Sequence, residues 1–102
     1  MATTRDKAAK ADKVTVQGIE VELKIDPSDD YEITELLITR MDENSTNRER
    51  SEATVKSYRL ILGDQYQRVK DELRAKHGGR LTNEDMISFM NDLMAASAAL
   101  KN

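Results

Sequence analysis

His77 is the single histidine of this 102-residue chain and the side chain best suited to proton transfer near neutral pH. A nucleophile relay needs such a base held by a third group against Ser, Thr or Cys, and no such pattern surrounds His77. Gly78-Gly79-Arg80 follows it, but this segment is too short for a phosphate loop and lacks the Gly-Lys-Ser/Thr ending. We interpret His77 as the basic end of a helix.

Two acidic pairs, Asp29/Asp30 and Glu84/Asp85, have the chemistry for general acid–base catalysis. Both pairs fall in the first turns of predicted helices, where carboxylates complement the positive end of the helix dipole. This structural role explains them without a reaction. We therefore predict that the chain is not an enzyme.

Metal and cofactor sites are not predicted either. Asp42-x-Asn44-x-Thr46 has the alternating oxygen ligands of a calcium loop, but the sixth position is Asn47 instead of Gly and the twelfth is Ala53 instead of Glu. The chain has no cysteine, which excludes disulfides and thiolate metal ligands and favours an intracellular compartment.

The composition predicts a single small domain with a thin core. Charged residues make up 34% of the chain and aromatic residues 4%, so little apolar surface is available for burial. We expect stabilisation by self-association, as a homo-oligomer, or by a larger partner. The net charge of −3 and the lack of an apolar run of about 20 residues predict no nucleic-acid and no membrane partner.

The hydrophobic pattern predicts a mainly α fold, with a small N-terminal β-hairpin followed by about four short helices. Residues 1–12 are polar and mixed in charge, as in a flexible tail, and residues 13–102 form the domain. Apolar residues alternate with polar ones over residues 14–25, with Gln17-Gly18 as the turn. The helices are expected over residues 29–41, 48–62, 64–76 and 83–100.

Capping residues define the helix boundaries. Ser28 or Asp29 is expected as the N-cap of the first helix, Gly63 as the left-handed end of the second, and Asp64 as the N-cap of the third. Thr82 with Asp85 resembles a capping box for the last helix. The first helix is expected to face inward through one apolar stripe, which comprises Ile33, Leu36, Leu37 and Met41, with Tyr31 nearby.

Four features together resemble the tail assembly chaperones of long-tailed phages and prophages, especially those of Gram-positive hosts. They are the hairpin, the acidic opening Asp29-Asp30-Tyr31-Glu32, the turn Leu62-Gly63-Asp64-Gln65-Tyr66, and the lead Gly79-Arg80-Leu81-Thr82 into the final helix. The resemblance covers about Val14 to Asn102.

This resemblance implies a binding protein that coats the tape-measure protein and recruits tail-tube subunits during tail assembly. It also implies a longer product of the same reading frame, made by ribosomal frameshifting, residence in the cytoplasm of the bacterial host, and absence from the mature virion. From the apolar spacing we predict the partner-binding residues, which are Tyr58, Tyr66, Met86, Phe89, Met90, Leu93 and Met94. The same stripe at helical spacing is also typical of a core.

Two alternatives remain open. The two helices around His77–Arg80 are arranged in sequence like a helix-turn-helix of a DNA-binding regulator, although Glu84, Asp85 and Asp92 would then face phosphates. The chain also suits a structural head or tail connector of the same virion.

Overall fold

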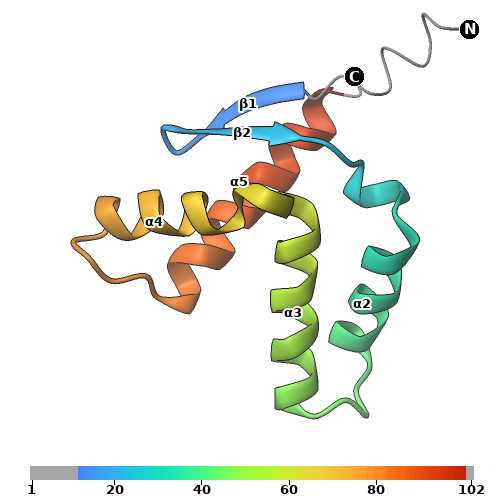
Figure 1. Ribbon diagram of the computed structural model, residues 1–102. Helices are drawn as coiled ribbons and strands as arrows, with labels where there is room; N and C mark the ends of the chain where they lie inside the picture. Colours follow the sequence, from blue (N-terminus) through green and yellow to red (C-terminus); the bar gives the residue numbers. More distant parts are fainter. Residues whose placement is uncertain (1–11, 101–102) are drawn as a thin grey trace, which may run out of the picture.

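The computed structural model describes residues 12–100, which form an N-terminal β-hairpin followed by helices (Figure 1). The mainly α fold predicted from the sequence is confirmed. The predicted tail lies outside the described residues, except that Asp12 already begins the first strand. The elements are β1 (Asp12–Val16), β2 (Ile19–Leu23), the 3₁₀ turn η1 (Pro27–Asp29), α2 (Tyr31–Met41), α3 (Asn47–Leu62), the 3₁₀ turn η2 (Gly63–Gln65), α4 (Tyr66–Lys76) and α5 (Asn83–Leu100).

The hairpin forms around the predicted turn. Val16 pairs with Ile19, so Gln17 and Gly18 are the two loop residues, and both have positive φ angles, +52° and +82°. Tight antiparallel hairpins favour this geometry because its twist matches that of the strands. The second strand ends at Leu23, two residues earlier than predicted, because the chain turns into η1.

The start of α2 differs from the prediction. Neither Ser28 nor Asp29 caps it; the N-cap is Asp30, whose Oδ1 accepts a hydrogen bond from the Ile33 N–H at 3.0 Å. Asp26 caps the preceding turn η1 by accepting from the Ser28 N–H at 3.0 Å. Two successive caps in this acidic segment delay the helix by about one turn of 3₁₀ structure.

The junction of α3 and α4 is confirmed at Gly63 and corrected at Asp64. Gly63 ends α3 with φ +58° and ψ −132°, a conformation suited to glycine. Asp64 makes no cap for α4 and instead pairs with Lys24 Nζ at 3.3 Å. The 3₁₀ turn η2 continues the chain here, so α4 begins at Tyr66.

Capping boxes open the two longest helices. The predicted box is confirmed at α5, where the Asp85 N–H donates to Thr82 Oγ1 at 3.0 Å and the Thr82 N–H donates to Asp85 Oδ2 at 3.2 Å. A second box, which was not predicted, joins Thr46 and Glu49 at the start of α3. Both place acidic residues where the helix dipole favours them.

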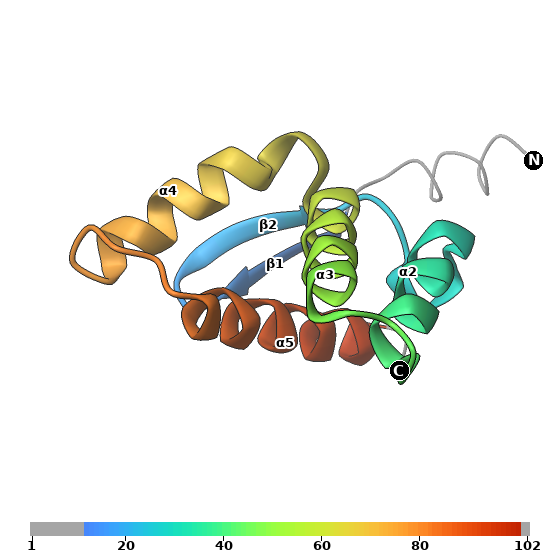
Figure 2. The same cartoon turned by 90° about the horizontal axis from the view of Figure 1, so that it is seen from below.

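The core lies between the apolar face of the hairpin and the helices α3, α4 and α5 (Figure 2). α2 is outside this arrangement: it runs antiparallel to α3 and packs mainly against it, so that the two helices form an arm (Figure 1). The core side chains are Val16, Ile19, Val21, Leu23, Ile33, Tyr58, Ile61, Leu62, Val69, Leu73, Phe89, Met90 and Leu93.

Gln65 fastens the outer edge of the hairpin to the helices. Its side-chain amide accepts from the Glu22 N–H and donates to the Glu22 carbonyl, both at 2.8 Å. It also donates to the Leu62 carbonyl at 3.1 Å. A single buried amide thereby satisfies both backbone groups of an edge residue, as a third strand would.

Candidate protein-binding surfaces

The structure divides the seven predicted partner-binding residues into core and surface. Phe89, Met90 and Leu93 are fully buried, with exposed fractions of 0%, 1% and 0%. Their placement on a contact surface is therefore corrected: the stripe on α5 packs against the hairpin face and forms the core. Met94 is partly buried against the same core.

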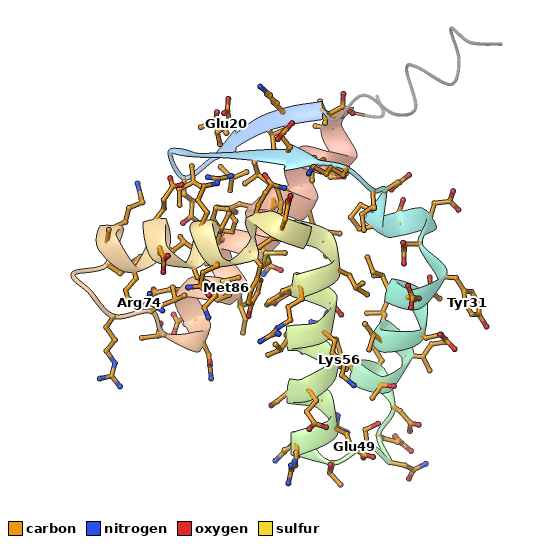
Figure 3. The ribbon with its side chains drawn as sticks, in the orientation of Figure 1. Glu20, Tyr31, Glu49, Lys56, Arg74 and Met86 are labelled. Carbon is orange, nitrogen blue, oxygen red and sulfur yellow. The ribbon has the colours of Figure 1, made fainter. Side chains whose placement is uncertain are left out.

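The remaining three, Tyr58, Tyr66 and Met86, come together in one groove of about 360 Å³. This groove, which we call the tyrosine groove, lies between α3, α4 and the first turns of α5, and Figure 3 shows Met86 on that side of α3. Its lining residues are Arg50, Ser51, Thr54, Val55, Tyr58, Tyr66, Lys70, Leu81, Thr82, Asn83, Met86 and Ile87.

The tyrosine groove combines apolar walls with positive charge. Its lining includes Arg50 and Lys70 but no Asp or Glu. Lys70 Nζ lies 5.1 Å from the centre of the Tyr66 ring, and Arg59 Cζ lies at the same distance. Cations this close to an aromatic face are attracted to it. Burial raises the pKa of the Tyr58 hydroxyl, so this tyrosine stays neutral in the groove wall.

Val55 and Ile87 are the most exposed apolar side chains of the groove, at 41% and 44%. Neither residue was predicted to contact a partner, because their contribution to the groove depends on how α3 and α5 are placed relative to each other. A concave apolar surface of this kind accepts the apolar face of an amphipathic helix.

A second apolar surface lies on α2, on the side away from α3. Only Ile33 of the predicted inward stripe is buried, and Leu36 is partly buried. The prediction that Leu37 and Met41 face inward is wrong, because α2 packs mainly against one helix, α3, and both side chains stay exposed. The large exposed side chains are Tyr31 (76%), Leu37 (45%), Ile38 (62%) and Met41 (75%).

Tyr31, Ile38 and Met41 are spaced by seven and three residues, so they lie along one side of the helix, which we call the outer face of α2. Figure 3 shows Tyr31 pointing away from α3. The sequence contained a signal for this surface: Ile38 does not belong to the predicted stripe, and a surface helix that is apolar on two sides indicates burial by something else.

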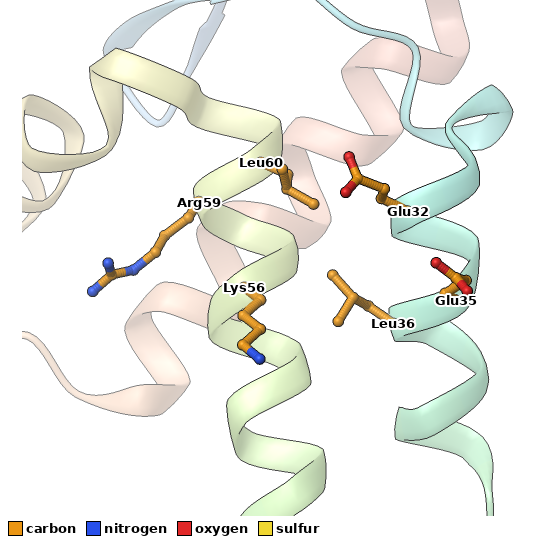
Figure 4. A pocket seen from close by; sticks show the side chains of 6 residues that line it. All are labelled: Glu32, Glu35, Leu36, Lys56, Arg59 and Leu60. Carbon is orange, nitrogen blue, oxygen red and sulfur yellow. The ribbon is translucent and has the colours of Figure 1, made fainter.

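A third, charged cleft of about 420 Å³ separates α2 from α3 (Figure 4). Leu36 and Leu60 line it, with Glu32 and Glu35 on α2 and Lys56 and Arg59 on α3. Among residues 12–100, none of these four charged side chains is within ion-pair distance of an opposite charge. Both carboxylates of the cleft, Glu32 and Glu35, are exposed to solvent.

Charge is distributed unevenly between the two apolar surfaces. Residues 26–43, which contain α2, carry seven acidic side chains and one basic side chain, a net charge of −6. Residues 48–80, which contain α3 and α4, carry nine basic and five acidic side chains, a net charge of +4. The segment that carries the outer face of α2 is thus acidic overall, whereas α3 and α4, which line the tyrosine groove, are basic overall.

Within residues 12–100, His, Asp and Glu side chains do not gather into a group of three or more that would hold a metal ion. None of the helices in this range has the length and hydropathy needed to cross a membrane. Comparison of the chain with protein-family models, with curated proteins and with solved structures gives no significant match.

Proposed function

We propose that this protein acts by binding, as a tail assembly chaperone that holds the apolar helices of a tape-measure protein and recruits tail-tube subunits around it. The observation that carries the proposal is the tyrosine groove, an apolar concave surface lined by three of the residues predicted to contact a partner. Binding of this kind involves no chemical step.

The groove has the features expected for an unstructured or helical client. Its walls come from three helices, and Met86 contributes a flexible side chain that adapts to different apolar partners. Tyr66 is partly exposed and provides an aromatic surface with few rotatable bonds, which limits the entropy lost on binding, whereas Tyr58, 8% exposed, forms the floor of the groove. Such a site covers apolar helix faces that would otherwise aggregate.

The direct test is coexpression with the tape-measure protein encoded by the same genome. We expect that protein to remain soluble and to copurify with the wild-type chain. The double variant Val55→Gln/Ile87→Gln should lose this effect, because it removes apolar contact from the groove without disturbing fully buried residues.

Leu60→Gln is the matched control. Leu60 is on the same helix as Val55 and is similarly exposed, 39% against 41%, but it lies outside the tyrosine groove. We expect Leu60→Gln to support the client as the wild type does. Equal solubility of the tape-measure protein with and without the chain would contradict the proposal, as would full activity of the groove variant.

The proposal also includes the longer frameshifted product, the host cytoplasm as the place of action, and release before the virion matures. Expression of the natural locus with an N-terminal tag, followed by mass spectrometry, should yield two products that share this N-terminus. Mass spectrometry of purified particles should not detect the chain. Its presence in particles at the level of a structural subunit would instead favour the connector alternative.

A further inference from the structure

We infer that the outer face of α2 in one copy of this chain docks into the tyrosine groove of a second copy, so that copies associate head to tail. This contact concerns the chain alone and goes beyond the proposed client binding. It would cover the groove when no client is present.

The two surfaces match in chemistry. The outer face of α2 presents Tyr31, Ile38 and Met41 to solvent, and the groove presents Val55, Ile87 and the partly buried aromatic and methionine side chains of its walls. An amphipathic helix laid into an apolar groove is a common mode of recognition. The two surfaces are also complementary in shape, because the outer face of α2 is convex and the tyrosine groove is concave.

The two surfaces also match in charge. Glu35 lines the cleft between α2 and α3, but it is also three residues before Ile38 and four after Tyr31, so it borders the outer face of α2 as well. The groove is bordered by Lys70 and Arg50 and has no acidic lining residue. Lys70 Nζ, which lies over the Tyr66 ring, has no carboxylate partner within residues 12–100, so it remains available for a carboxylate from another chain.

The arrangement of the helices excludes docking within one chain. The outer face of α2 points away from α3, and the groove lies on the opposite side of α3, as the positions of Tyr31 and Met86 in Figure 3 show. α3 therefore separates the two surfaces of one molecule. Because they face in opposite directions, each copy has one surface free for a preceding copy and the other for a following copy.

A contact between two different surfaces repeats from copy to copy and gives a ring or an open filament. A two-fold contact of α2 with α2 is less favourable because it would bring the acidic segment of one copy, net charge −6, against the same segment of the other. The head-to-tail contact instead joins this acidic segment to the basic side of α3 and α4.

Complementation between two variants tests the proposal. One variant, Glu35→Gln/Ile38→Gln, has a defective outer face and an intact groove; the other, Val55→Gln/Ile87→Gln, has a defective groove and an intact outer face. Sedimentation velocity over a range of concentrations should show species larger than a dimer for the wild type and monomers for each variant. An equal mixture of the two should form 1:1 dimers that grow no further, since only one productive contact remains.

Two results would overturn the proposal: a wild-type chain that stays monomeric at millimolar concentration, or a groove variant that still dimerises by itself, which indicates a contact of α2 with α2. Circular dichroism melts confirm that the variants are folded. Leu60→Gln, outside both surfaces, should associate as the wild type does.

Charge reversal provides a second readout. Glu35→Lys and Lys70→Glu should each weaken association roughly threefold to tenfold, because each replaces an attraction at the rim by a repulsion. The chain with both substitutions should recover the wild-type association constant. Additive weakening in that double variant would show that the two residues do not meet.

The outer-face variant separates this inference from the proposed function. Glu35→Gln/Ile38→Gln keeps the groove, so it should hold the tape-measure protein soluble while remaining monomeric. If it associates normally, the self-docking inference fails and the client proposal stands. If it is monomeric but does not help the client, the client proposal fails and the self-docking inference stands.

Discussion

Two regions of the molecule, the hairpin with α4 and α5 on one side and the helix α2 on the other, use apolar residues in opposite ways. In the first region Val21, Val69 and Leu73 are fully buried, and each element covers another. In α2 only Ile33 reaches the core, and the helix exposes Tyr31 and other large apolar side chains. In the first region the apolar side chains stabilise the fold because they are buried. In α2 most of them stay exposed, so they are available to bind another protein.

Local hydrogen bonds compensate for the small burial of α2. Asp30 caps its N-terminus, and Arg50 of α3 donates a hydrogen bond to the Asp42 carbonyl at its C-terminus at 2.8 Å. These contacts orient the helix without covering its outer face. We expect α2 to unfold locally more readily than the region around α5, because it has fewer buried apolar side chains.

The largest effect is expected where a core side chain is truncated. Phe89→Ala should lower the free energy of unfolding by about 3–5 kcal/mol, because Phe89 has an exposed fraction of 0% and its removal leaves a cavity. Urea unfolding followed by circular dichroism measures the change. If the free energy of unfolding fell by less than about 1 kcal/mol, this core would be loosely packed. The proposed difference between the buried core and the exposed side chains of α2 would then be wrong.

Removal of the buried amide should have the next largest effect. Gln65→Leu leaves the Glu22 N–H and carbonyl without their protein partner, which should lower the free energy of unfolding by about 1–3 kcal/mol. Gln67→Leu is the matched control, since Gln67 lies two residues further on, in the first turn of α4, where its side chain is exposed and bonds to Asp71. Equal losses for the two variants would show that the amide does not fasten the hairpin.

A smaller, pH-dependent effect is expected at the start of α5. The Thr82 backbone N–H, with the Thr82 hydroxyl and His77, holds the pKa of Asp85 below its ordinary value of 3.8. The carboxylate therefore stabilises the folded state above pH 3.8, and this contribution is lost as the pH falls through the lowered value. The melting temperatures of wild type and Asp85→Asn should differ at neutral pH and converge in acid. A gap that persists unchanged below that range would contradict the cap.

The smallest effect on folding is expected on the outer face of α2. Ile38→Ser should change the free energy of unfolding by less than about 0.5 kcal/mol, since its side chain is 62% exposed. The measurement is the same urea titration at a concentration low enough to prevent association. A loss of about 2 kcal/mol or more would show that Ile38 contributes to folding, and α2 would then resemble the rest of the molecule.

Features set by neighbouring residues were predictable from the sequence. The Gln17-Gly18 turn, the helix end at Gly63 and the Thr82/Asp85 box depend on contacts within a few residues, and all three are present. The Thr46/Glu49 box has the same kind of pattern and was identifiable in principle.

Features that join distant segments were not predictable. The amide of Gln65 binds Glu22, which is 43 residues away in the sequence. The residues around either position form no local pattern that predicts this contact. Likewise, the spacing of Phe89 and Met90 suits both a core and a partner surface, and only the position of the hairpin decides between them. The outer face of α2 is exposed because α2 packs mainly against α3, and this arrangement is set by the tertiary structure.

The most direct test of the claim that α2 is a binding surface is disulfide cross-linking between copies, which is clean because the chain has no cysteine of its own. Chains with Ile38→Cys and chains with Ile87→Cys are mixed in equal amounts and oxidised mildly, and the products are identified by mass spectrometry. We predict that the mixed pair forms well beyond its statistical share of the cross-linked product. A statistical mixture, or a product dominated by pairs of Ile38→Cys chains, would contradict the docking of α2 into the tyrosine groove.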